Sequence, residues 1–152
     1  MRPTQSPAKR FTRHPSCEGS FEARVNQKPF VMTSLLGGLA ERPELSQVSD
    51  HWVWKVIADG KVGNARTSFG LFFDHDLRLG THNLIGHDRI RVIFNETRAK
   101  QSVIYHSGHF QTGVLTLIEA NPRTLRLRGE FSFGMSAMAF DVTDGVFDVQ
   151  GR

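Results

Sequence analysis

Apolar and polar residues alternate strictly in the C-terminal third of the chain. In residues 124–133, TLRLRGEFSF, the side chains of Leu125, Leu127, Phe131 and Phe133 fall on one face of an extended backbone, and the polar side chains fall on the other. A period of two is typical of an antiparallel strand with one buried face. We therefore predict that this segment is a half-buried strand.

The same alternation recurs along the chain, in short segments bounded by Gly, Asn, Asp or Pro. The segments predicted as strands, besides the one above, are residues 21–25, 29–32, 51–59, 67–73, 90–94, 101–107, 114–119, 138–142 and 145–149. Tight turns are predicted at Asn26-Gln27, Asp59-Gly60 and Asp144-Gly145. The pattern indicates an antiparallel meander of short strands.

Two stretches break this pattern. Residues 33–50 contain Gly37, Gly38 and Pro43 between short apolar patches, which predicts a long loop. Residues 74–88 predict turns with one short strand, either around 77–79 or around 83–85. Long loops in compact domains are often functional, so both stretches are candidates for contacts.

The fold class that follows is all-β: an antiparallel β-sandwich or a flattened barrel of about eight to ten strands. We place one domain at residues 21–152. Residues 1–20 hold three of the six prolines and several basic residues, which predicts a tail that is disordered or becomes ordered against a partner.

Most of the net positive charge lies in the N-terminal segment. The net charge is +4, and residues 1–20 contain four basic residues against one acidic residue, which leaves +1 for the rest of the chain. A nearly neutral domain lacks the basic surface of a nucleic-acid-binding protein, so we expect no nucleic-acid partner. No apolar stretch approaches the roughly 18 residues of a membrane helix, and we expect a soluble protein without a membrane span.

One cluster has the chemistry of a metal site. His75, His82 and His87 lie close together in the sequence among several aspartates, of which Asp76 is the candidate fourth ligand. Imidazole and carboxylate groups bind zinc and related ions, but the spacing is equally typical of histidines in solvent-exposed loops. We expect no cofactor, with a divalent metal as the alternative if these side chains converge.

Two pairs of side chains are candidates for ligand binding. Trp52 and Trp54 are in register with the apolar face of their strand and are predicted core residues, or else a stacking platform for a ring. Arg126 and Arg128 share a face with Glu130, where they form a solvated charge ladder or bind an anionic ligand.

Signs of catalysis are few. His106, Ser107 and His109 are neighbours, but no G-x-S-x-G segment is present to form a nucleophile elbow. The single cysteine, Cys17, stands in the predicted tail without an activating neighbour. The sequence therefore favours a protein that is not an enzyme.

Two segments together resemble a known group of proteins. FEARVNQKPFV near the N-terminus, and GVLTLIEANPRTLRLRGEFSF followed by FDVTDGVFDV near the C-terminus, are similar to the ends of uncharacterised bacterial all-β domains, many of them envelope lipoproteins. The resemblance implies a β-sandwich or flattened barrel without an established activity. It also implies an envelope location, whereas the absence of a leader and of a lipid-attachment motif at Cys17 predicts a cytoplasmic one by default.

Our functional hypothesis is a non-enzymatic binding module that contacts another protein chain, including a second copy of itself, through its loops or its edge strands. One alternative is a barrel that carries a small apolar ligand among its many phenylalanines. The other is a metal-dependent enzyme that uses the His and Asp cluster.

Overall fold

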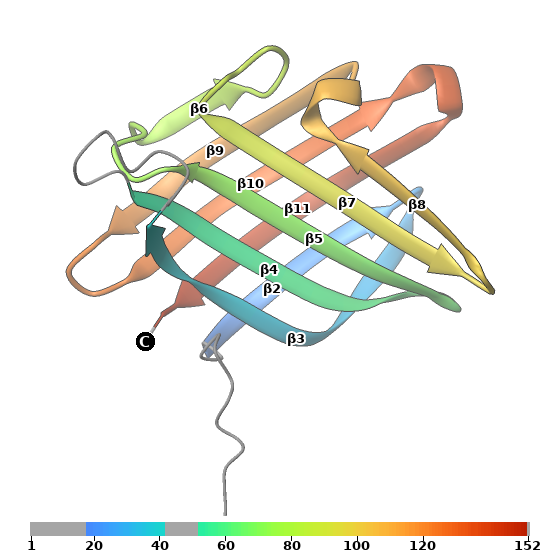
Figure 1. The fold of residues 1–152 in the computed structure, drawn as a ribbon, viewed down its shortest axis with the longest axis horizontal. Helices are drawn as coiled ribbons and strands as arrows, with labels where there is room; N and C mark the ends of the chain where they lie inside the picture. The colour runs from blue at the N-terminus through green and yellow to red at the C-terminus, as the bar shows by residue number, and fades with distance from the viewer. Residues whose placement is uncertain (1–17, 42–51, 152) are drawn as a thin grey trace, which may run out of the picture.

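The computed structural model describes residues 18–41 and 52–151, and these form ten strands in one antiparallel sheet (Figure 1). The strands are β2 (Glu18–Val25), β3 (Lys28–Glu41), β4 (Trp52–Val62), β5 (Ala65–Asp74), β6 (Gly80–Asn83), β7 (Ile90–Arg98), β8 (Gln101–His106), β9 (Thr112–Asn121), β10 (Arg126–Met135) and β11 (Phe140–Gln150). Two 3-10 turns, η3 (Ser107–His109) and η4 (Ser136–Met138), complete the described secondary structure. The all-β prediction is confirmed.

The sheet is folded over into two facing layers. Its strand order is β6-β9-β10-β11-β2-β3-β4-β5-β7-β8. β2 and β3 pair only beside their turn, at Arg24 with Pro29 and at Val25 with Lys28, and then diverge. The five strands from β6 to β2 consequently form one layer and the five from β3 to β8 the other (Figure 1). This curled, open sheet agrees with the predicted sandwich or flattened barrel.

The strand predicted from strict alternation is β10. Leu127, Phe131 and Phe133 are buried, whereas Glu130 is exposed on the opposite face. Leu125 differs, because it stands before β10 in the turn after β9 and has a positive φ of 61°. The first hairpin is also as predicted, since Asn26 and Gln27 both have positive φ, which matches the twist of paired strands.

The predicted loop at residues 33–50 is wrong for its first half. β3 continues to Glu41 and pairs with β4 along its length. Gly37 and Gly38 lie within the strand, where a Cβ on Gly151 would be 3.2 Å from the carbonyl oxygen of Gly37. The absence of a side chain on Gly151 therefore allows this part of the chain to approach β3 closely. Residues 42–50 lie outside the described residues.

Two predicted turns are also wrong, for the same reason. Gly60 lies inside β4, where a Cβ would be 2.1 Å from the backbone oxygen of Val31. Gly145 lies inside the continuous strand β11, where a Cβ would be 2.6 Å from the ring of Phe131. Asp144, with a φ of 54°, forms a bulge in that strand rather than a hairpin turn.

Other boundaries shift by a few residues. The short strand expected within 74–88 is β6, Gly80–Asn83, which falls between the two predicted positions. β2 begins at Glu18 and pairs with β11 from that residue, so the domain starts earlier than residue 21. Residues 1–17 of the predicted tail lie outside the described residues. The described chain contains no helix with the length and apolar character needed to cross a bilayer.

Phenylalanine rings fill the space between the layers. Phe69 of β5 is fully buried, and its ring centroid lies 5.2 Å from that of Phe21 and 5.0 Å from that of Phe30. It also lies 5.3 Å from Phe94 and 5.9 Å from Phe131, so that one ring contacts side chains from both layers. The pairs with Phe30 and Phe94 are edge-on, an arrangement that adds stability beyond the area that the rings bury.

Removing this ring should destabilise the fold strongly. We expect Phe69→Ala to lower the free energy of unfolding by about 3–5 kcal/mol, because the cavity would lie where both layers meet. Urea denaturation measures the effect, and Phe69→Leu provides a milder variant if the alanine variant does not fold. The matched control is Phe72→Ala on the outer face of β5, whose loss should be clearly smaller; equal losses would contradict the packing described.

Candidate functional site

Strand β8 forms one edge of the sheet. It pairs with β7 along one side, from Arg98 with Gln101 to Ile93 with His106, and the strand order ends there among the described residues. Five of its six residues are exposed. Two of these are aliphatic, Val103 at 39% exposure and Ile104 at 54%. β8 therefore presents an unpaired backbone edge flanked by apolar side chains.

The strand is nevertheless held firmly on its inner side. The ring of Tyr105 lies parallel to that of Phe94, with centroids 6.3 Å apart, and 5.1 Å from that of Phe140 in the other layer. The hydroxyl groups of Thr97 and Ser102 lie 2.8 Å apart near the other end. A strand fixed in an extended conformation has little further entropy to lose when a partner pairs with it.

Natural proteins protect edge strands with Lys, Pro, charged side chains, bulges or short length. The segment QSVIYH of β8 contains no proline, lysine or carboxylate. The opposite edge, β6, differs: it is four residues long and has the polar sequence GTHN. β8 is thus the less protected of the two edges, and the edge-strand contact predicted from the sequence would occur there.

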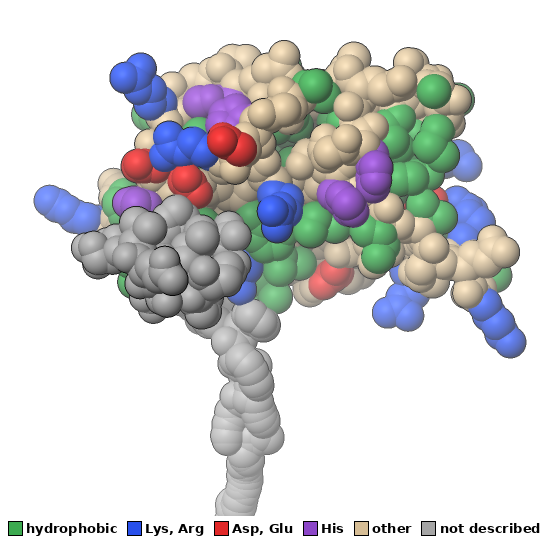
Figure 2. Space-filling model, turned by 45° about the horizontal axis from the view of Figure 1, so that its top comes forward, with side chains coloured by type: hydrophobic (Ala, Val, Ile, Leu, Met, Phe, Trp, Pro, Cys, Tyr) green, Lys and Arg blue, Asp and Glu red, His purple; other side chains and the backbone are tan. Residues whose placement is uncertain are grey.

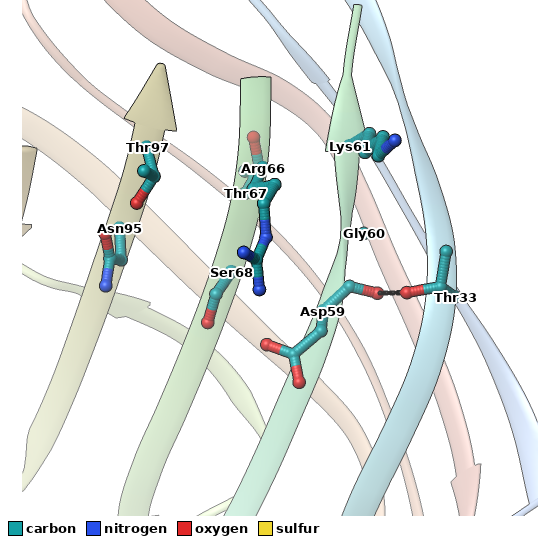
Figure 3. Close-up of a pocket in the computed structure, with 9 residues that line it drawn as sticks. All are labelled: Thr33, Asp59, Gly60, Lys61, Arg66, Thr67, Ser68, Asn95 and Thr97. Carbon is teal, nitrogen blue, oxygen red and sulfur yellow. Dashed lines mark hydrogen bonds between the residues drawn. The ribbon is translucent and has the colours of Figure 1, made fainter. Parts of the chain in front are cut away.

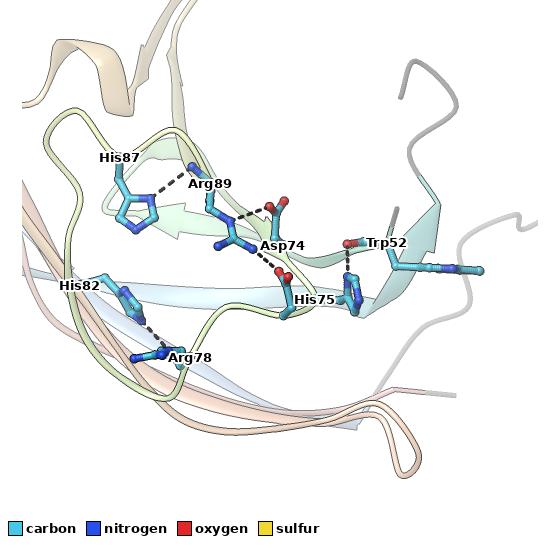
Figure 4. Close-up of polar contacts among 8 residues, drawn as sticks. Trp52, Asp74, His75, Arg78, His82, His87 and Arg89 are labelled. Carbon is cyan, nitrogen blue, oxygen red and sulfur yellow. Dashed lines mark hydrogen bonds and ion pairs between the residues drawn. The ribbon is translucent and has the colours of Figure 1, made fainter. Parts of the chain in front are cut away.

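The histidines of the candidate metal set make separate local contacts (Figure 4). His75 Nδ1 lies 3.1 Å from the backbone oxygen of Trp52, and His82 Nε2 lies 2.7 Å from that of Arg78. His87 Nδ1 accepts a 3.2 Å hydrogen bond from the backbone N–H two residues further on. Only the rings of His82 and His87 are neighbours, with centroids 5.6 Å apart. His75 does not join them.

Asp76, the fourth candidate ligand, faces a cation instead. Arg89 donates a 2.9 Å hydrogen bond to Asp74 and also binds Asp76 (Figure 4). The hydrogen bond to Asp74, with the charge of Asp76, raises the pKa of Arg89 above its usual value. Across residues 18–41 and 52–151, no three His, Cys, Asp or Glu side chains gather as metal ligands. Histidines are likewise scattered over the face seen in Figure 2.

The two arginines predicted to share a face do so, but each pairs with a carboxylate across the strands. Arg126 makes two hydrogen bonds to Asp148, of 2.9 and 3.0 Å, and these raise its pKa. Arg128 lies 3.6 Å from Glu119. Since neighbouring strands already supply anions, the arrangement corresponds to the charge ladder rather than to an open anion site.

The tryptophan pair is divided between the core and the surface. Trp54 is 1% exposed, and its indole N–H has no hydrogen-bond partner within the described part of the chain. Trp52, at the start of β4, is 38% exposed. Two indoles with such different exposure do not form one stacking platform.

The interior offers little room for the apolar ligand of the alternative hypothesis. Rings of Phe110 and Phe133 stack there at 4.3 Å between centroids, and Phe131 and Phe140 lie within 6.1 and 6.3 Å of Phe133. The largest pockets that we describe open on the outer faces instead.

No protein-family model, curated protein or solved structure matches this chain. The resemblance to lipoprotein domains therefore stays a prediction. The sequence predicted an edge contact only in general terms, and that prediction did not single out Val103 and Ile104. The sequence feature that marks these two residues is an uncharged strand next to a polar turn. This feature indicates an exposed edge only when the strand order is known.

Fluorescence quenching can test the different positions of the two tryptophans. In Trp52→Phe the remaining indole is buried, so we expect blue-shifted emission that iodide quenches little. In Trp54→Phe the remaining indole is exposed, and iodide should quench it readily. Equal quenching of the two variants would contradict the described packing of β4.

Proposed function

We propose that this protein is a non-enzymatic binding module that contacts another protein chain by backbone pairing at the edge strand β8. The observation that carries the proposal is the exposed, uncharged edge of β8 with Val103 and Ile104 beside it. Added strands gain affinity from main-chain hydrogen bonds and specificity from alternate side chains. A rigid edge with aliphatic side chains on both faces suits this mode of recognition.

A second copy of the chain is the partner that β8 itself fits. Antiparallel pairing about a twofold axis at Ile104 would bring the two Ile104 side chains together and place Val103 opposite Tyr105. Lys100, just outside the strand, would lie at the η3 end of the other copy rather than beside another lysine. Self-pairing therefore buries the exposed aliphatic groups without bringing like charges together.

Light scattering after size-exclusion chromatography can test this proposal. We expect the mass to rise from monomer to dimer with concentration, and Ile104→Lys to shift the chain to monomer, because the ammonium group would be desolvated in the contact. The matched control is Val114→Lys. Val114 is an apolar residue of 41% exposure on β9, which is paired there with both β6 and β10.

Amide hydrogen exchange provides the second measurement. Residues 101–106 should become more protected as the concentration rises, whereas the β6 edge should not change. A different partner chain would give the same protection, and Ile104→Lys would abolish its binding. Three results together would contradict the proposal. The protein stays monomeric at all concentrations, no bound chain slows the amide exchange of residues 101–106, and Ile104→Lys weakens the binding of no partner chain.

A further inference from the structure

A polar pocket lies on the outer face of the second layer, over β3, β4, β5 and β7 (Figure 3). Its volume is about 460 Å³, and its lining is rich in hydroxyl, amide and charged groups. The side chains that matter for its chemistry are Asp59, Lys61, Arg66, Ser68, Asn95 and Thr97. No part of the sequence analysis singled out this set.

Strand register places these residues in two rows. Asp59 of β4 lies opposite Ser68 of β5, which lies opposite Asn95 of β7. Two residues further along, Lys61 lies opposite Arg66, which lies opposite Thr97. The alternation of strands points all of these side chains to the same face. One row therefore offers hydrogen-bond acceptors, and the adjacent row carries two cations.

The two cations lack carboxylate partners. Neither Lys61 nor Arg66 forms an ion pair with any described residue, although Arg89 and Arg126 elsewhere in the molecule do. Figure 3 shows the Arg66 side chain directed along β5 toward Ser68, and the Asp59 carboxylate directed toward β5. Arg66 and Asp59 thus face the same space without contacting each other. A negatively charged group of a ligand can therefore pair with Arg66, and a positively charged group can pair with Asp59.

The acceptor row contains a further unsatisfied group. Asn95 Oδ1 is buried and has no hydrogen-bond partner among the described residues. A buried acceptor without a partner costs about 1–3 kcal/mol. The terminal torsion of an asparagine is soft, so its oxygen can turn toward a donor that enters the pocket. Asp59 is only partly satisfied: one carboxylate oxygen accepts a 3.3 Å hydrogen bond from Ser34, and the other has no hydrogen-bond partner among the described residues.

From this arrangement we propose that the pocket binds a free α-amino acid. The ligand carboxylate lies against the guanidinium of Arg66, which binds such groups through two parallel hydrogen bonds. Lys61, opposite Arg66 in the strand register, adds positive charge to this end of the pocket, although its side chain points toward β3 (Figure 3). The ligand ammonium donates to the Asp59 carboxylate and to Asn95 Oδ1. The acceptor row and the cation row are about 6.6–6.8 Å apart along the strands. A ligand with its ammonium and carboxylate groups close together can therefore contact both rows at once.

Pocket size and composition agree with this ligand. A volume of about 460 Å³ holds an amino acid together with its side chain. The remaining wall, with Thr33, Ser68 and Thr97, offers hydroxyl groups, and the pocket contains no aromatic ring on which a sugar or base would stack. The occupant is thus a small polar zwitterion rather than a nucleoside or an apolar molecule.

Nuclear magnetic resonance titration of the full chain with each of the twenty protein amino acids tests the proposal. We expect at least one of them to shift the amide signals of residues 59–61, 66–68 and 95–97. Its N-acetyl derivative, which lacks the ammonium group, and its carboxamide, which lacks the carboxylate, should each bind at least about tenfold more weakly.

Matched variants assign the two ends of the ligand. Arg66→Gln should weaken the amino acid and its N-acetyl derivative, whereas Asp59→Asn should weaken the amino acid and its carboxamide. Arg91→Gln removes an exposed arginine of β7 outside this pocket and should leave the affinity unchanged. A failure at β8 is distinguishable from a failure here, because light scattering reports self-association through β8, whereas the amide signals of residues 59–61 and 66–68 report binding of the amino acid.

The proposal is overturned if no amino acid shifts these signals at millimolar concentration. It is equally overturned if the N-acetyl derivative or the carboxamide binds as well as the amino acid, since then only one charge is recognised. Unchanged affinity in both Arg66→Gln and Asp59→Asn would place the ligand elsewhere.

Discussion

The aromatic packing between the two layers is the interaction on which the rest of the structure depends. β2 and β3 are joined at only two residue pairs, so backbone hydrogen bonds contribute little to holding one layer over the other. Side chains do this instead, with Phe69 in contact with rings from β2, β3, β7 and β10. A close-packed interior of this kind also fixes which residues of each strand face outward.

The outer surface follows from that inner constraint. In β5, the burial of Phe69 and Leu71 requires Arg66 and Ser68 to point away from the core. In β7, the burial of Phe94 has the same effect on Asn95 and Thr97. The polar pocket is therefore the reverse side of the aromatic core. A shift of one residue in the register of β5 would remove both together.

Much of the fold was predictable because its strands carry a local signal. The alternation in β10 and β5 reports burial directly, and most of the strands were expected close to where they lie. The errors occur where a glycine is required by a neighbour rather than by a turn. Gly60 and Gly145 interrupt the pattern because a backbone oxygen and a phenyl ring approach them, and no local signal distinguishes this from a chain reversal.

The candidate sites were much less predictable, because they depend on strand order. Asn95 and Ile104 are opposite each other in β7 and β8, and nothing in the sequence indicates that β8 has no further neighbour among the described strands. Conversely, His75 and His82 are close in the sequence but make contacts in different directions. Proximity along the chain is a poor guide to proximity in a sheet.

The position of β11 has a consequence for how the chain folds. This strand lies inside its layer, between β10 and β2, yet it follows every other described strand in the sequence. During synthesis, β2 emerges early and pairs with β11 only after all the other described strands have been translated, so Glu18 meets Gln150 late. The strands of the other layer pair in chain order, with β6 alone passing to the first layer between β5 and β7, so this layer can form before β11 is present.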